Sequence, residues 1–316
     1  MWQSALRGIS VLSAGASESG FLIVDKPQDI TSAQVVARVK RLTRAKKVGH
    51  TGTLDPFATG VVICCLNQAT KLSRFFLEGE KKYEATLCLG IATDTQDITG
   101  KVLSEADPSG CDEARIRSVF SQFEGEIEQH PPIYSALKHE GVPLYKLARK
   151  GKPVQKPARR VRISYIRVLD ICLPEVGFEV LCSSGTYVRT LAADVGTALG
   201  CGGHLKSLRR TRSSQFTIQD ALTLPELETI ATSGRCSDQM IPLSDALPRM
   251  PSYIANDALK RKIKYGSPLS RKDLPLEAFA GSGEFVRVTD SQNNLLAVLS
   301  HRKMAHRYNY CCVFHQ

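Results

Sequence analysis

Apolar positions near the start of the chain follow two different periods. Phe21 to Val24 form an unbroken apolar run that ends shortly before a proline, which is typical of a buried strand. Thr31 then precedes apolar residues spaced three or four positions apart, and Gln34 follows it three positions later. This pattern predicts a helix that begins with a capping box. Residues 82–90 alternate between apolar and polar side chains, as expected of a half-buried strand.

Helical and extended segments continue to alternate up to residue 200. Residues 112–123 and 190–199 carry apolar stripes of helical period, and Gly200 is a typical residue to end a helix. Residues 176–190 have the character of a strand. This mixture of elements predicts an α+β fold with a mixed central sheet.

The stretch from about residue 127 to 160 differs from its surroundings. It has little periodicity, contains Pro131 and Pro132, and carries a basic run from Lys146 to Arg160. Loops of this length in compact domains are usually functional or disordered. We interpret the stretch as an ordered insert that acts as a lid and contacts a polyanion.

Prolines cluster between residues 225 and 251 and mark a boundary. After it, residues 284–290 and 295–300 alternate on either side of a turn-rich tetrapeptide, which predicts a hairpin. Residues 308–314 add another strand. We therefore expect a flexible tail, a large domain containing the insert, and a small basic β module, with bounds 1–19, 20–235 and 241–316.

Basic residues are concentrated in a few segments. The 316 residues include 42 Lys and Arg against 31 Asp and Glu, a formal net charge of +11. Of these, 29 basic residues but only two acidic ones fall in the windows 38–47, 138–162, 206–212, 249–272 and 302–307. Single-sign segments on an otherwise acidic chain favour one phosphate-binding surface and a nucleic-acid partner. Scattered basic loops that never meet in space are the alternative.

The cysteines and the apolar runs indicate in which cellular compartment the protein works. The ten Cys show no CxxC spacing, and several lie in apolar runs, as is typical of buried thiols in a reducing compartment without structural zinc. No apolar run reaches the length of about 18 residues that a membrane-spanning helix needs. The N-terminal residues do not resemble a signal peptide. We expect a cytoplasmic protein with no metal and no membrane contact.

The segment from Lys46 to Gly60 is the strongest candidate for chemistry. It is rich in Gly and Thr and holds one carboxylate, Asp55, and one imidazole, His50, in basic surroundings. An Asp before Pro is more often a turn residue or a helix N-cap than a catalyst, and a His in such a loop is equally suited to be a general base. Neither the Walker spacing nor the dinucleotide-binding glycine motif is present.

Eight short blocks, in one order along the chain, resemble the TruB-type tRNA pseudouridine synthases. They are GFLIVDKP (20–27), GHTGTLDP (49–56), ATK (69–71), KY (82–83), TDT (93–95), YSALK (134–138), GTYVRT (185–190) and LRR (208–210). The C-terminal module is similar in placement and character to the PUA-like RNA-binding domain of that family. The resemblance implies the pseudouridine synthase fold for residues 20–235 and a PUA-like domain for residues 241–316.

The resemblance also implies a reaction. Such enzymes isomerise uridine to pseudouridine at position 55 in the T arm (TΨC loop) of tRNA, and the target nucleotide must be flipped out of the folded RNA. The isomerisation requires no cofactor and no metal. Asp55 is implied as the catalytic residue. Attack on the base, attack on the sugar and abstraction of a sugar proton all stay open at this point.

Further roles follow from the same blocks. Arg189 is implied to pair with Asp55, since a carboxylate in a dry pocket needs a partner, and Tyr83 to stack on the target base. His50 is implied to fill the space that the flipped nucleotide leaves. Asp94 orients a neighbouring group or simply closes a turn. The other implied substrate-binding residues are Lys71, Tyr187 and Leu208.

We expect tRNA, bound at its T arm and elbow, as the partner of a monomeric protein. The predicted contacts to the RNA backbone are Lys146, Arg149, Lys150, Lys152, Arg209 and Arg210. Two other functions would use the same basic surface: a non-catalytic tRNA-binding or folding chaperone, and a related synthase that acts on other RNAs with a guide RNA and protein partners. The chaperone would not need Asp55, and the absence of long basic tails favours a stand-alone enzyme over the guided one.

Overall fold

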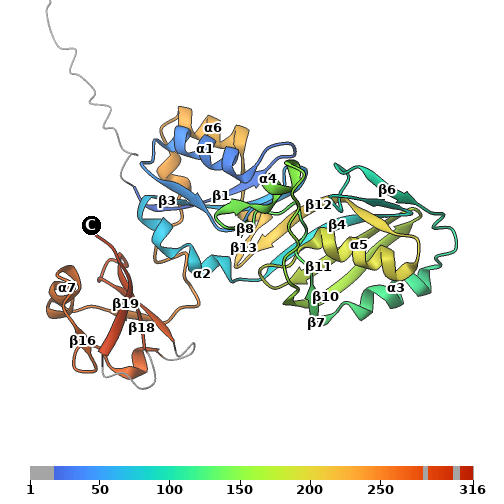
Figure 1. Ribbon diagram of the computed structural model, residues 1–316. Coiled ribbons are helices and arrows are strands. Elements are labelled where there is room, and N and C mark those ends of the chain that lie inside the picture. Colours follow the sequence, from blue (N-terminus) through green and yellow to red (C-terminus); the bar gives the residue numbers. More distant parts are fainter. Residues whose placement is uncertain (1–17, 280–283, 302–306, 316) are drawn as a thin grey trace, which may run out of the picture.

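Two sheets organise the chain (Figure 1). The computed structural model describes residues 18–279, 284–301 and 307–315. Residues 1–17 of the predicted tail and 302–306 of the last basic window lie outside these ranges. Within the described ranges, every helix is too short or too polar to cross a bilayer.

The large sheet has ten strands and is mixed, as predicted. Across the sheet its main path is β14 (Leu222–Thr223), β1 (Gly20–Lys26), β3 (Thr59–Leu66), β12 (Gly203–Ser213), β4 (Lys81–Leu89), β11 (Glu175–Cys182), β10 (Arg159–Cys172) and β7 (Gly125–Gln129). Two short strands, β2 (Val48–His50) and β13 (Phe216–Thr217), pair with β3 and β12. β1 runs parallel to β14, and β3 runs parallel to β12, whereas the other pairs are antiparallel.

Helices cover one face of this sheet. Their buried residues share one hydrophobic core with Leu22 and Val24 of β1. The helices are α1 (Ser32–Thr43), α3 (Glu113–Gln122), α5 (Val188–Leu199) and α6 (Leu224–Thr232). Phe21 and Ile23 point to the opposite face and pack into a second core. Because both faces of β1 are buried, its residues from Phe21 to Val24 form an uninterrupted apolar run.

Most predicted elements are confirmed, with shifts at their ends. The helix after Thr31 carries both hydrogen bonds of the capping box with Gln34, and β4 alternates between buried and partly exposed positions. The strand predicted over 176–190 ends at Cys182, and Gly185, which has a φ of +85°, lies in the turn that follows. This left-handed conformation suits glycine and turns the chain into α5, which ends at Gly200 as predicted.

The weakly periodic insert contains regular structure. It leaves β7, forms a hairpin of β8 (Lys138–His139) and β9 (Val142–Pro143), continues in α4 (Leu144–Arg149) and returns through β10. Its first part is attached to α5, because the carbonyl oxygen of Tyr134 accepts a hydrogen bond from Arg189 Nη2 at 2.9 Å. The insert therefore contains a hairpin and a helix, and its role as a lid in contact with a polyanion stays a prediction.

Short elements connect the larger ones. They are η1 (Asn67–Leu72), α2 (Arg74–Leu77), β5 (Ile91–Thr93), β6 (Val102–Glu105), η2 (Ile218–Asp220) and η3 (Cys236–Gln239). β5 and β6 form a separate two-stranded ribbon. Of these elements, η1 and α2 lie on the side of the large sheet that faces the C-terminal module.

The C-terminal module is a five-stranded sheet with a core of its own. Its strands follow the order β15 (Ser252–Ile254), β17 (Phe285–Thr289), β18 (Leu295–Ser300), β19 (Arg307–Val313) and β16 (Leu269–Ser270), with α7 (Asp257–Lys264) and η4 (Leu276–Phe279) beside them. The predicted hairpin, β17–β18, and the final strand are confirmed. The second core joins Phe21 and Phe76 to Val298 and Phe314 and so connects the module to the large sheet. The exact domain bounds stay a prediction.

Candidate functional site

Asp55 lies on an irregular loop, residues 51–58 (the Asp55 loop), between β2 and β3. Lys26 Nζ donates a hydrogen bond to the carbonyl oxygen of Pro56 at 3.0 Å and reaches two further carbonyls at 2.7 and 2.8 Å. On the other side, the Ser32 hydroxyl accepts a hydrogen bond at 2.9 Å from the amide of the residue before Asp55. The side chains that make these contacts, Lys26 and Ser32, are both buried. The loop is thus fixed on both sides of its carboxylate.

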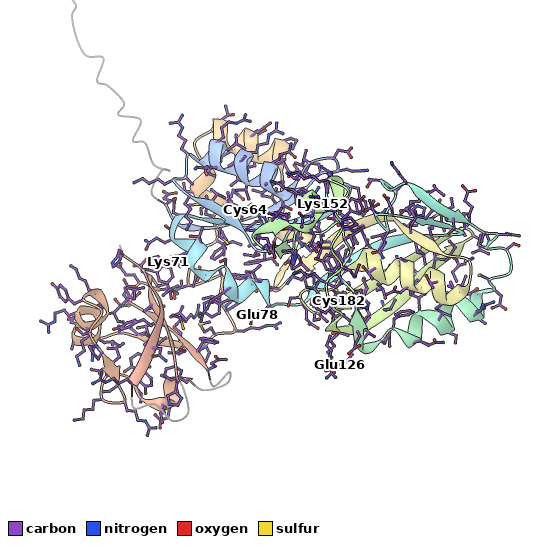
Figure 2. All side chains as sticks on the ribbon, viewed as in Figure 1. Cys64, Lys71, Glu78, Glu126, Lys152 and Cys182 are labelled. Carbon is purple, nitrogen blue, oxygen red and sulfur yellow. The ribbon has the colours of Figure 1, made fainter. Side chains whose placement is uncertain are left out.

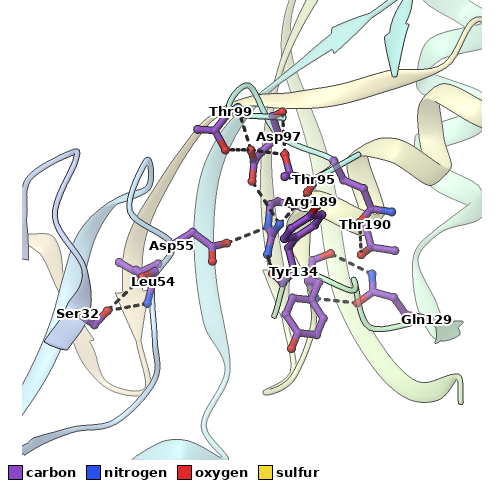
Figure 3. Close-up of polar contacts among 12 residues, drawn as sticks. Ser32, Leu54, Asp55, Thr95, Asp97, Thr99, Gln129, Tyr134, Arg189 and Thr190 are labelled. Carbon is purple, nitrogen blue, oxygen red and sulfur yellow. Dashed lines mark hydrogen bonds and ion pairs between the residues drawn. The ribbon is translucent and has the colours of Figure 1, made fainter. Parts of the chain in front are cut away.

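The Asp55 carboxylate faces Arg189, the second residue of α5 (Figure 3). Arg189 Nε lies 2.9 Å from Asp55 Oδ2, and the side chains are 4% and 35% exposed. The start of α5 is held by Gln129, whose side chain exchanges two hydrogen bonds with the backbone of Tyr187 at 2.7 and 3.0 Å. The pair implied by the family resemblance is therefore present, and its carboxylate is open on one side.

Arg189 also contacts a second carboxylate that the sequence analysis missed. Its Nη1 lies 3.3 Å from Asp97 Oδ2, and Asp97 is 4% exposed. Asp97 Oδ1 accepts hydrogen bonds from the Thr95 hydroxyl at 2.7 Å and from the Thr99 amide and hydroxyl at 2.9 and 2.6 Å. The other Arg189 donors reach the carbonyl oxygens of Thr95 and Tyr134. One guanidinium therefore bridges two carboxylates in a fixed orientation.

The charge state of Asp55 reflects this environment. Burial raises the pKa of Asp55 above the ordinary carboxyl value, while the Arg189 guanidinium opposes the rise. Asp97 raises the pKa further, and Lys26 lowers it. An ionised carboxylate of raised pKa is a stronger base and nucleophile than an ordinary one. The site therefore holds a carboxylate of raised pKa beside a buried cation.

A cavity of about 380 Å³ opens beside this carboxylate. Residues 135–137 of the insert form part of its wall, with Gly185 and Thr186 of the turn before α5. Five residues expected at the substrate line it together, although they are distant in sequence: Asp55, Tyr83, Tyr187, Arg189 and Leu208. The volume lies in the range of pockets that enclose small molecules, about 300–1,000 Å³.

Tyr83 and Arg210 line the same cavity and are almost fully buried, at 8% and 2% exposed. Burial raises the pKa of Tyr83, with Arg210 opposing the rise, so the phenol is neutral at physiological pH. Arg210 donates from Nε to the carbonyl of Val61 at 2.7 Å and from Nη2 to that of Gly52 at 3.0 Å. The Arg210 guanidinium therefore supports the Asp55 loop from inside the protein, and its contact with the RNA backbone stays a prediction.

His50 and Asp94 lie next to the site without lining the cavity. Burial and the neighbouring Arg210 lower the pKa of His50, so its imidazole is neutral near pH 7. Its implied role beside the flipped nucleotide stays a prediction. Asp94 closes a turn by accepting from the Lys101 amide at 2.8 Å, and it also accepts from the Tyr134 hydroxyl at 3.4 Å.

Lys71 does not line the cavity, and its implied contact with the substrate stays a prediction. It lies on η1, on the side that faces the C-terminal module (Figure 2). Its Nζ donates to the carbonyl oxygen of Val313 at 2.6 Å and lies 5.3 Å from the centre of the Phe314 ring. Gln68, on the same turn, exchanges hydrogen bonds with the backbone of His315 at 2.7 and 3.1 Å. Lys71 thus fastens the end of the chain to the large domain.

Basic residues of the insert and of β12 differ in how far they are neutralised. In β12, Lys206 pairs with Glu175, and Arg209 lies 2.7 Å from Asp25. Arg209 is 40% exposed and stays a predicted RNA contact. Four exposed residues of the insert form no ion pair with any residue that the structure describes; these insert cations are Lys146, Arg149, Lys150 and Lys152. They are free to meet phosphates.

Several supporting residues were absent from the sequence-based predictions. Lys26 stands inside the first resemblance block and Asp97 just after another, but neither position has a periodic or compositional signal of its own. Gln129 lies at the start of the insert, where it was indistinguishable from other polar residues. Their roles depend on contacts with residues 30 to 92 positions away, which local patterns do not record.

Two family models match the chain. The one for the TruB family pseudouridylate synthase (N terminal domain) matches residues 40–188, and the one for the tRNA pseudouridylate synthase B C-terminal domain matches residues 189–249. The curated tRNA pseudouridine synthase B of Burkholderia mallei (strain NCTC 10247) is 45% identical over 88% of this chain and 92% of its own. The relative of that name from Geobacter sulfurreducens is 45% identical over 84% and 86%.

Solved structures agree with this assignment. A chain of the crystal structure of a Cbf5-Nop10-Gar1 complex is similar with a TM-score of 0.71 and 27% identity, covering 93% of this chain and 84% of that one. A chain of an H/ACA RNP bound to a substrate RNA gives the same TM-score at 26% identity, covering 94% and 85%. The predicted pseudouridine synthase fold with a PUA-like C-terminal domain is confirmed. The chain belongs to the TruB family of pseudouridylate synthases.

Proposed function

We propose that this protein converts uridine to pseudouridine at position 55, in the T arm of tRNA, with Asp55 as the catalytic carboxylate. Relatives that are 45% identical over most of both chains carry the name tRNA pseudouridine synthase B. The proposal rests on the placement of the Asp55 carboxylate. One of its oxygens lies 2.9 Å from Arg189 Nε, and its open side borders a nucleoside-sized cavity.

The reaction is an isomerisation within one nucleotide. The bond from C1′ to N1 of uracil breaks, the base turns, and a bond from C1′ to C5 forms, while one proton leaves C5 and one is gained at N1. No atom is added or lost, so no cofactor or metal is required. Ionised Asp55 acts as nucleophile or base, and Arg189 fixes its direction and stabilises its charge.

The cavity walls hold the extruded base. Tyr83 stacks on uracil, a contact of a kind worth about 1–3 kcal/mol per base. Tyr187 and Leu208 enclose the nucleoside from the neighbouring walls. His50, at the edge of the site, fills the gap in the RNA stack. Since a flipped base must leave its stacked neighbours, these contacts offset part of the cost of extrusion.

RNA binding uses surfaces on both domains. The insert cations bind phosphates of the T arm, and the fold of the loop and the extruded bases supply specificity. The PUA-like domain, residues 241–316, binds on the acceptor-stem side, and residues 20–235 form the catalytic domain. The protein acts as a monomer in the cytoplasm, and a single species of 34.7 kDa in sedimentation would support the monomer.

The test compares Asp55→Asn with the wild-type chain on an unmodified tRNA transcript. Loss of turnover with tRNA affinity within a few fold of wild type is expected, because the carboxylate acts in chemistry and not in docking. Asp107→Asn, which removes an exposed carboxylate that caps a distant turn at Ser109, is the matched control. Turnover that survives in Asp55→Asn would refute the catalytic role.

The choice of RNA separates the alternatives. A synthase of position 55 modifies the intact transcript and ignores a transcript that lacks the T loop. A chaperone binds tRNA and leaves uridine unchanged. A guided synthase is inactive on tRNA until a guide RNA and protein partners are added. Mapping of the modified position in each RNA distinguishes the three outcomes.

A further inference from the structure

Arg159 differs from the other cations that line the cavity. Four basic residues border it: Lys81, Arg159, Arg189 and Arg210. Three of them are 2–6% exposed and their charged groups are engaged inside the protein. Arg159 is the member of this set that is partly exposed. It is therefore the pocket cation that a ligand can reach without displacing protein atoms.

The side chain of Arg159 is held in a fixed place. Arg159 is the first residue of β10 and pairs across the sheet with Gln129, the residue that holds the Tyr187 backbone. Its guanidinium lies over the Tyr187 ring, 4.8 Å from Cζ to the ring centre. Its Nη2 donates to the carbonyl oxygen of Gly185. Stacking on an aromatic face and one hydrogen bond orient the group before any ligand binds.

The charge of Arg159 is not neutralised. Its guanidinium forms no ion pair within residues 18–279, 284–301 and 307–315, and its Nη1 has no hydrogen-bond acceptor there. The insert cations are exposed and form no ion pair with any described residue either. By contrast, Arg189 is shared between the carboxylates of Asp55 and Asp97. A pre-oriented guanidinium with a free donor is suited to bind a phosphate.

We propose that Arg159 binds a backbone phosphate next to the extruded uridine and so fixes the nucleotide at the mouth of the cavity. The inference rests on the proposed function, because it needs a flipped nucleotide in the pocket. Tyr187 then has two tasks, as a wall for the nucleoside and as the platform for the guanidinium. Clamping the phosphate limits how far the sugar can move while the base turns.

The experiment pairs enzyme variants with modified RNAs. A T-arm stem–loop carries a neutral methylphosphonate in place of one of the two phosphates that flank the target uridine. Each RNA is bound to the full-length wild type, Arg159→Gln and Arg159→Lys, and dissociation constants and single-turnover rates are measured. Arg160→Gln is the matched control, because it removes the same charge from the next, exposed residue of β10.

For the wild type, we expect one of the two methylphosphonates to weaken binding about tenfold. Arg159→Gln should bind the unmodified RNA about tenfold more weakly and be insensitive to that methylphosphonate. Arg159→Lys should keep part of the sensitivity, because lysine keeps the positive charge but lacks the planar guanidinium that stacks on Tyr187 and donates two parallel hydrogen bonds. Arg160→Gln should stay as sensitive as the wild type. A folding defect alone would leave the sensitivity to the methylphosphonate in place.

Two outcomes would overturn the inference in distinguishable ways. If Arg159→Gln remains as sensitive as the wild type at both linkages, the phosphate contact does not exist, although the enzyme is active. If the wild type forms no pseudouridine in the unmodified stem–loop or in tRNA, the proposed function itself fails. Pseudouridine formation by the wild type is therefore measured in the same samples.

Discussion

Replacing Arg189 with methionine tests the central contact of the site. Methionine fills a similar apolar length but leaves two carboxylates without their shared cation. Asp97 is the more consequential of the two for stability, because it is 4% exposed, whereas the Asp55 side chain is 35% exposed and partly hydrated. The carbonyl oxygens of Thr95 and Tyr134 also lose their donors. The variant should be less stable and inactive.

The size of the effect can be worked from the distances. Two unit charges about 3 Å apart attract by about 5 kcal/mol at an effective dielectric constant of about 20. Removing the arginine also removes its own desolvation cost, and Asp97 keeps three hydrogen bonds to Thr95 and Thr99. The free energy of unfolding should therefore fall by about 3 kcal/mol, at the low end for a broken buried ion pair. Turnover should fall at least about a hundredfold with the loss of oriented charge.

Urea-induced unfolding measures the stability, and pseudouridine formation under single-turnover conditions measures the activity. Adding Asp97→Asn to Arg189→Met removes the uncompensated buried charge and should recover about 1 kcal/mol or more of stability. Activity should not return, because the arginine that orients Asp55 is still missing. An Arg189→Met variant within about 0.5 kcal/mol of the wild type would refute the bridging role of this residue.

Neutralising the four insert cations together should flatten the slope of log Kd against log salt for tRNA by about 3, at roughly 0.7–0.9 per phosphate contact. An unchanged slope would place the insert away from RNA. The reaction needs ionised Asp55, so turnover is lost when the pH falls below the pKa of Asp55. Asp97→Asn removes a negative charge that raises this pKa. The acid limb of the pH–rate profile should therefore move to lower pH, and a limb that stays in place would contradict this coupling. Lys26→Met leaves three carbonyl oxygens without their donor and should lower the free energy of unfolding by about 2 kcal/mol, whereas the exposed Lys40→Met should change it by less than about 0.5 kcal/mol.

Local sequence determined the secondary structure and the main chemical candidate. Periodicity and capping signals located the helix after Thr31, the alternating strand at 82–90 and the C-terminal hairpin within a few residues. These features depend on neighbours in sequence, so local patterns contain them. The resemblance blocks identified Asp55 and Arg189, which the structure brings to within 2.9 Å of each other.

Tertiary structure alone decided which polar residues work together. Lys71 and Arg210 both stand in resemblance blocks, yet Lys71 contacts the C-terminal module outside the cavity, whereas Arg210 lines the cavity and supports the Asp55 loop. Asp97 has no distinctive local pattern, and nothing in the basic run from Lys146 to Arg160 sets Arg159 apart. The positions of both side chains depend on contacts with α5 and the turn before it. Burial and charge compensation are properties of the whole packed chain, because each depends on what segments distant in sequence place around a group.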